Sequence, residues 1–160
     1  MQHRESPEAA GALDNALLEL MLDHPRPWSE AELAHTTSLP GHIPSALARL
    51  SYDGLANRWG DLASPTYAAA RFFGIHHDCS EPDFERRHEF AVLEALLARD
   101  CSGRKSMTRK ALLRAMGVKK KSRVAFIDAI GRLRAAGLLE GAGNRLFLSR
   151  AALRFDKIAI

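Results

Sequence analysis

Residues 129–138 read AIGRLRAAGL, and residues 46–55 read ALARLSYDGL. The match between them extends without a gap over residues 46–75 and 129–158, at a constant offset of 83, and eleven of these thirty positions are identical. Self-similarity at a fixed offset indicates one supersecondary unit that is used twice. The sequence therefore predicts two similar domains of about 80 residues, a size near the lower limit for an independent core.

The first copy contains the signals of four helices and a hairpin. Ser29 followed by Glu32 has the form of a capping box, and Gly54 is placed to end a helix. Gly60 and Asp61 lie in a short linker that suits a tight turn between two strands. The pattern predicts helices at about 13–23, 29–35, 42–53 and 67–73, with a hairpin at 55–64.

The second copy repeats this order. Its apolar row Phe126, Ile130 and Leu133 corresponds, position by position, to the row in the first copy formed by Ile43, Leu47 and Leu50. Apolar residues at this spacing form one face of a helix. The predicted helices are at about 87–99, 108–116, 122–136 and 149–157, and the predicted hairpin is at 138–148.

The chain resembles the winged helix-turn-helix family of prokaryotic DNA-binding proteins. The resemblance lies in the segments 49–55 and 132–138, each of which is followed by a hairpin that contains glycine. It implies a mainly α fold with small β-hairpin wings (α+β), built as two tandem winged helix-turn-helix domains. The predicted boundaries are a disordered leader at 1–12, domain 1 at 13–75, a linker at 76–86 and domain 2 at 87–160.

Charge separates the two copies. Residues 1–82 contain 5 Lys and Arg against 11 Asp and Glu, a net charge of −6, whereas residues 83–160 contain 18 against 8, a net charge of +10. A basic domain of this size attracts polyanions, and an acidic one repels them. We therefore expect double-stranded DNA to be contacted mainly by domain 2, and domain 1 to act as an adaptor.

The resemblance implies that the third helix enters the major groove and that the wing touches the flanking backbone. Four cations lie at the start of that helix and can neutralise phosphates; they are Lys119, Lys120, Lys121 and Arg123. For Arg132, a DNA contact and a surface pair with Asp128 are both open. The predicted DNA-binding residues are Lys119, Lys120, Lys121, Ser122, Arg123, Arg132 and Arg145.

Two alternatives concern protein partners. A tandem winged-helix chain can also be an interaction scaffold, similar to the accessory subunit of bacterial condensin, in which both copies contact proteins. Association through the terminal helices would give a homodimer. The apolar residues that suggest this association are Phe72, Phe73, Leu153, Phe155, Ile158 and Ile160.

Other chemistry has little support. His76, His77, Cys79, His88 and Cys101 match no compact metal-ligand motif, and no nucleophile, base and orienting group can be proposed. We expect no enzyme activity, no metal and no cofactor. The sequence has no apolar run long enough to cross a membrane and no secretion signal at its start, which favours a cytoplasmic protein.

Overall fold

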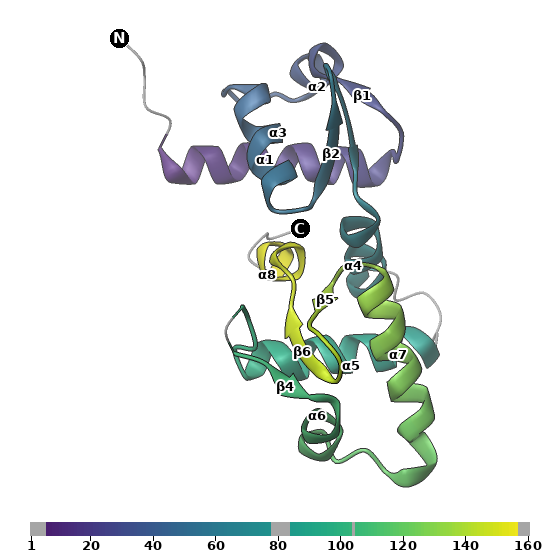
Figure 1. Cartoon of the computed structure of the whole chain (residues 1–160). Coiled ribbons are helices and arrows are strands. Elements are labelled where there is room, and N and C mark those ends of the chain that lie inside the picture. The colour runs from purple at the N-terminus through teal and green to yellow at the C-terminus, as the bar shows by residue number, and fades with distance from the viewer. Residues whose placement is uncertain (1–5, 78–83, 104, 157–160) are drawn as a thin grey trace. The chain divides into compact units, whose positions relative to one another are not determined.

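The computed structural model describes residues 6–77, 84–103 and 105–156 and is mostly helical (Figure 1). Its backbone divides into two compact units. Unit 1 comprises residues 1–70 together with 154–160, and unit 2 comprises residues 71–153. These divisions differ from the predicted domains, because the last helix of each copy is shared between the units.

Unit 1 contains three helices, a three-stranded sheet and the start of a fourth helix. Its strands are antiparallel in the order β1-β3-β2, with Trp28 opposite Ala63 and Arg58 also opposite Ala63 on the other side. The first and third helices pack together around buried leucines. The elements are α1 (Pro7–Asp23), β1 (Trp28–Ser29), α2 (Glu30–Thr36), α3 (Ile43–Tyr52), β2 (Ala56–Trp59), β3 (Leu62–Pro65) and α4 (Tyr67–His77).

Unit 2 has the same order of elements. Its strands are antiparallel in the order β4-β6-β5, and α5 packs against α7. A short 3-10 helix, η1, precedes α7. The elements are α5 (Phe84–Ala98), β4 (Met107–Thr108), α6 (Arg109–Ala115), η1 (Lys120–Ser122), α7 (Arg123–Ala135), β5 (Leu139–Glu140), β6 (Arg145–Leu148) and α8 (Arg150–Asp156).

Local signals account for most of these boundaries. The predicted capping box is present: the Ser29 hydroxyl accepts from the Glu32 amide at 3.1 Å, and the Glu32 carboxylate accepts from the Ser29 amide at 2.8 Å. The bond from the Ser29 amide holds the pKa of Glu32 below its usual value. Thr66, Thr108 and Ser149 likewise accept from the amide three residues ahead, as Ser and Thr commonly do at the residue before a helix.

Three predictions about boundaries need correction. Residues 7–12 of the predicted leader are helical, because Ser6 caps α1 and Pro7 occupies its first turn; residues 1–5 lie outside the described residues. The segment between the two helices is shorter than the predicted linker, since α4 continues to His77 and α5 begins at Phe84. Each hairpin also gains a third strand, β1 or β4, only two residues long.

The observed class is α+β: helices predominate, and two small antiparallel sheets of three strands each accompany them. Among the described residues, no helix combines the length and the apolar character that crossing a membrane requires.

Each unit buries a carboxylate under two arginines. In unit 1, Asp14 is 1% exposed and accepts from Arg49 at 2.7 and 3.0 Å and from Arg154 at 3.0 Å. In unit 2, Glu89 is fully buried and accepts from Arg71 at 3.0 Å and from Arg132 at 2.6 Å. Burying a carboxylate is expensive unless charged donors satisfy it.

The two clusters are related by the repeat. Arg49 and Arg132 are equivalent positions of the two copies, and so are Arg71 and Arg154. Arg71 lies in the last helix of the first copy, and Arg154 lies in the last helix of the second. Nevertheless, Arg71 belongs to unit 2 and Arg154 belongs to unit 1. Each unit is therefore completed by an arginine that the other copy of the repeat supplies.

We predict that Asp14→Asn lowers the free energy of unfolding of unit 1 by about 2 kcal/mol, because both arginines lose a charged acceptor. The measurement is urea unfolding followed by tryptophan fluorescence. Both tryptophans of the chain, Trp28 and Trp59, belong to unit 1, so the signal reports on this unit alone. Glu19→Gln, an exposed change on the same helix, is the control. Equal stability of the two variants would refute the structural role of Asp14.

Candidate nucleic-acid interface

The arginines of unit 1 are all occupied by carboxylates. Within residues 6–70 and 154–156, the four cations are Arg26, Arg49, Arg58 and Arg154. Arg26 pairs with Glu32 at 3.3 Å and Arg58 pairs with Glu30 at 2.9 Å, while the other two hold Asp14. The described part of unit 1 thus offers no cation that lacks an acidic partner.

Unit 2 has the opposite character. Two of its described cations, Arg71 and Arg132, form ion pairs with the buried Glu89. Many others are exposed and bond to no acceptor in the described part of the chain. They include Arg109, Lys110, Arg114, Lys119, Lys120, Lys121, Arg123 and Arg145. These cations gather on α6, on the turn before α7 and on the β5–β6 hairpin, and they form the candidate interface.

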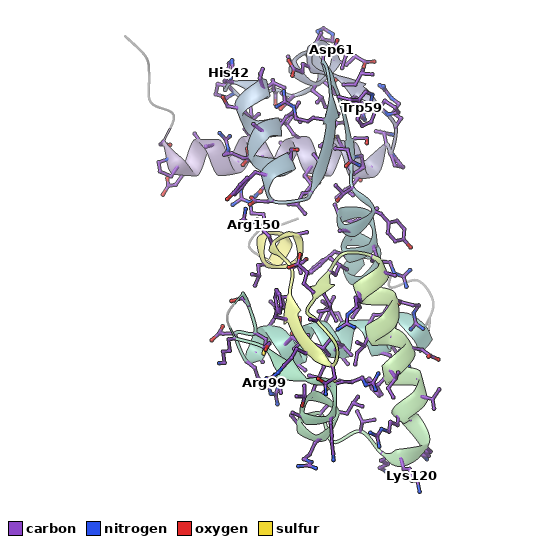
Figure 2. The ribbon with its side chains drawn as sticks, in the orientation of Figure 1. His42, Trp59, Asp61, Arg99, Lys120 and Arg150 are labelled. Carbon is purple, nitrogen blue, oxygen red and sulfur yellow. The ribbon has the colours of Figure 1, made fainter. Side chains whose placement is uncertain are left out.

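The turn between α6 and α7 presents the predicted lysines. Lys119, Lys120 and Lys121 are all exposed, and Figure 2 shows Lys120 at the end of the turn, directed away from the ribbon. The η1 turn places two of these lysines immediately before the first residue of α7. Ser122, the residue before α7, is half-buried, and its hydroxyl makes no capping bond.

The outer face of α7 borders a hollow of about 620 Å³. The helix contributes small residues to it, including Gly131 and Ala135, together with Asp128 and Arg134. Gly143 and Asn144 of the hairpin turn form the opposite wall, and Arg109 lies at the start of α6. Val124, also on the outer face, is 69% exposed. A hollow between a helix and a hairpin, with cations on its rim, has the shape and charge to receive a polyanion.

The β5–β6 hairpin is held against α7 by Arg134. Its guanidinium donates to the carbonyl oxygens of Gly143 at 3.3 Å and Arg145 at 3.1 Å. Gly141 is required for the shape of the hairpin, because a Cβ there would lie 2.1 Å from the Arg145 carbonyl oxygen at a φ of +131°. The Arg145 side chain is exposed next to the turn, as the sequence predicts.

Arg132 is engaged elsewhere. Its Nε donates to the buried Oε1 of Glu89 rather than to Asp128, the surface partner considered from the sequence. Arg71 donates to the same carboxylate. This geometry gives Arg132 a structural role, that of joining α7 to α5, and its partly exposed side chain also lines the hollow beside α7.

Sequence reasoning missed three cations of this surface. Arg109, Lys110 and Arg114 lie on α6, whose buried face consists of Leu112 and Leu113. The spacing of Lys110 and Arg114, four residues apart, places both on one side of the helix. This spacing is visible in the sequence, but only the structure shows which other cations they approach.

The remaining candidates stay outside the site. No group of three or more potential metal ligands occurs among the described residues. His88 packs edge-on against Phe126 at 4.5 Å, and burial raises the pKa of the Cys101 thiol. His76 and His77 are helical in α4, while Cys79 lies outside the described residues.

The apolar residues considered for dimerisation are only partly described. Phe72 is buried in the core, and Phe73 and Leu153 are half-buried. Phe155 has no described side chain, and Ile158 and Ile160 lie outside the described residues. Phe72 is therefore not available to a second copy of the chain.

Comparisons of this chain with protein-family models, with curated proteins and with solved structures gave no match.

We predict that Arg132→Gln lowers the stability of unit 2 much more than Arg123→Gln does. Arg132→Gln should lower the free energy of unfolding of unit 2 by about 2 kcal/mol, since it leaves the buried Glu89 with one arginine. Arg123 is exposed and unpaired, so its replacement should change stability by less than about 0.5 kcal/mol. The measurement is urea unfolding followed by far-ultraviolet circular dichroism. If the two variants were equally stable, the structural role of Arg132 would be wrong.

Proposed function

We propose that this chain is a tandem winged helix-turn-helix protein that binds duplex DNA through unit 2, as a transcriptional regulator. The order of α-helices and strands is the same in the two copies, which supports the tandem fold. The observation that carries the DNA assignment is the distribution of cations. Every described cation of unit 1 has an acidic partner, whereas in unit 2 those on α6, on the turn before α7 and on the hairpin, together with Arg123 of α7, do not.

In this proposal α7 lies in the major groove. Its thirteen residues extend over about 20 Å, enough to follow the groove floor. Gly131 and Ala135 keep the outer face narrow, so the helix can approach the base edges closely. Lys119, Lys121 and Arg145 then meet phosphates at the two ends of the contact, and these phosphate contacts position the helix.

Asp128 opposes phosphate binding at the centre of α7, because a carboxylate is repelled by the DNA backbone. It is exposed and lines the hollow beside Gly131. A carboxylate on this face can instead accept from the amino group of cytosine in the major groove. Asp128 would then contribute to recognition of the DNA sequence rather than to the affinity for DNA.

Unit 1 has a different role in the proposal. It presents exposed aromatic side chains, Trp59 and Tyr67, and its described cations are already paired with carboxylates. Aromatic residues are enriched at protein interfaces. Unit 1 therefore acts as the adaptor for a protein partner, which retains one element of the scaffold alternative.

The test is binding of the full chain to duplex DNA, followed by fluorescence anisotropy between about 50 and 200 mM salt. The variant Lys119→Gln/Lys121→Gln should bind more weakly. The slope of its log affinity against log salt concentration should correspond to about two fewer phosphate contacts. Its control, Arg26→Gln/Arg58→Gln, removes the same charge from unit 1 and should bind like the unaltered protein.

Absence of salt-dependent binding by the unaltered chain would overturn the DNA proposal and favour the scaffold alternative. Equal weakening in both double variants would mean that net charge alone attracts the DNA, which would remove the assignment to unit 2.

A further inference from the structure

A second hollow lies in unit 2, between α6 and the start of α7. Its volume is about 300 Å³, and its lining consists of Lys110, Arg114, Lys120 and Arg123 with two apolar residues, Leu113 and Val118. The four cations come from three elements: two from α6, one from η1 and one from α7. No carboxylate lines this hollow.

The four cations have no partner within the described part of the chain. Each is exposed, and none forms an ion pair or donates a hydrogen bond to a described acceptor. Elsewhere in the same unit, arginine side chains do find acceptors: Arg134 donates to hairpin carbonyls and Arg99 donates to the Ala95 carbonyl at 2.9 Å. The donors around this hollow are therefore left for a ligand.

The arrangement is electrostatically unfavourable without an anion. Four like charges around one hollow repel one another, and Leu113, which is buried, and Val118, which is half-buried, give it an apolar floor. Field lines concentrate where cations line a concave surface with low-dielectric walls. Lys and Arg together supply donors that suit the oxygens of a phosphate group.

We propose that this hollow is a phosphate-binding site. The phosphate has two possible sources: the DNA strand that flanks α7, or a free oligophosphate ligand. A phosphate of the DNA strand rests on the proposed function and extends it, because it places α6 on the DNA backbone beside the major groove. The second source does not depend on DNA binding.

The experiment uses two double variants of the full chain with equal charge. Lys110→Gln/Arg114→Gln removes the α6 side of the hollow. Arg87→Gln/Lys105→Gln removes two exposed, unpaired cations of the same unit that do not line it. Calorimetric titration with tripolyphosphate at low salt measures the affinity for phosphate, and anisotropy measures the binding of duplex DNA. Circular dichroism verifies that both variants fold.

We expect tripolyphosphate to bind the Lys110/Arg114 variant at least tenfold more weakly, about the factor for one lost charged hydrogen bond, and to bind the control variant normally. Equal affinity for both variants would overturn the phosphate site. If the hollow takes DNA, the salt dependence of DNA binding also decreases by one to two contacts in the Lys110/Arg114 variant only, an estimate of roughly one per cation removed.

The failures of the two proposals are distinguishable. Loss of tripolyphosphate binding without any change in DNA binding assigns the hollow to a free ligand. If the unaltered chain binds tripolyphosphate but not DNA, the phosphate site stands and the proposed function falls.

Discussion

A carboxylate buried beneath two guanidinium groups is the interaction around which each unit is organised. Asp14 and Glu89 come from the first helix of their units, and the arginines that hold them come from the third helix and from the last helix of the repeat. An uncompensated buried charge would cost several kcal/mol, so the helices that carry the arginines have little freedom to move. In unit 2 this fixes α7 on α5, and with α7 the hairpin that Arg134 holds.

The same pairing explains why the two units differ in the number of exposed cations that lack an acidic partner. In unit 1 the described arginines are all used internally, on Asp14, Glu30, Glu32 and Asp53. In unit 2 the buried Glu89 engages two arginines, and many other cations are exposed on α6, on the turn before α7 and on the hairpin. One fold thus supports two surfaces of different character. The difference arises from side chains on exposed positions, which can change without disturbing the core.

The structural features that could be predicted from the sequence are those determined by neighbouring residues. The capping box at Ser29, the glycine at the end of α3 and the hairpin turns are all determined within a few residues, and they were predicted correctly. The two-residue strands β1 and β4 were missed, because they are strands only through their pairing with distant β3 and β6. The partner of Arg132 was missed for the same reason, since Glu89 lies 43 positions away. The hollow beside α6 also depends on elements that are separated in the sequence.

The reciprocal supply of Arg71 and Arg154 means that neither unit coincides with one copy of the repeat: unit 1 consists of two separate stretches of the chain, and unit 2 begins within the first copy. A fragment that ends at the junction of the two copies would keep Asp14 and Arg49 but lose Arg154, and the complementary fragment would keep Glu89 and lose Arg71. Each isolated half would have a buried carboxylate with half of its donors. Expression of a single copy is therefore a poor route to a single unit. A fragment that begins at Arg71 keeps both arginines of unit 2, whereas unit 1 needs a circular permutation that joins residues 154–160 to residues 1–70.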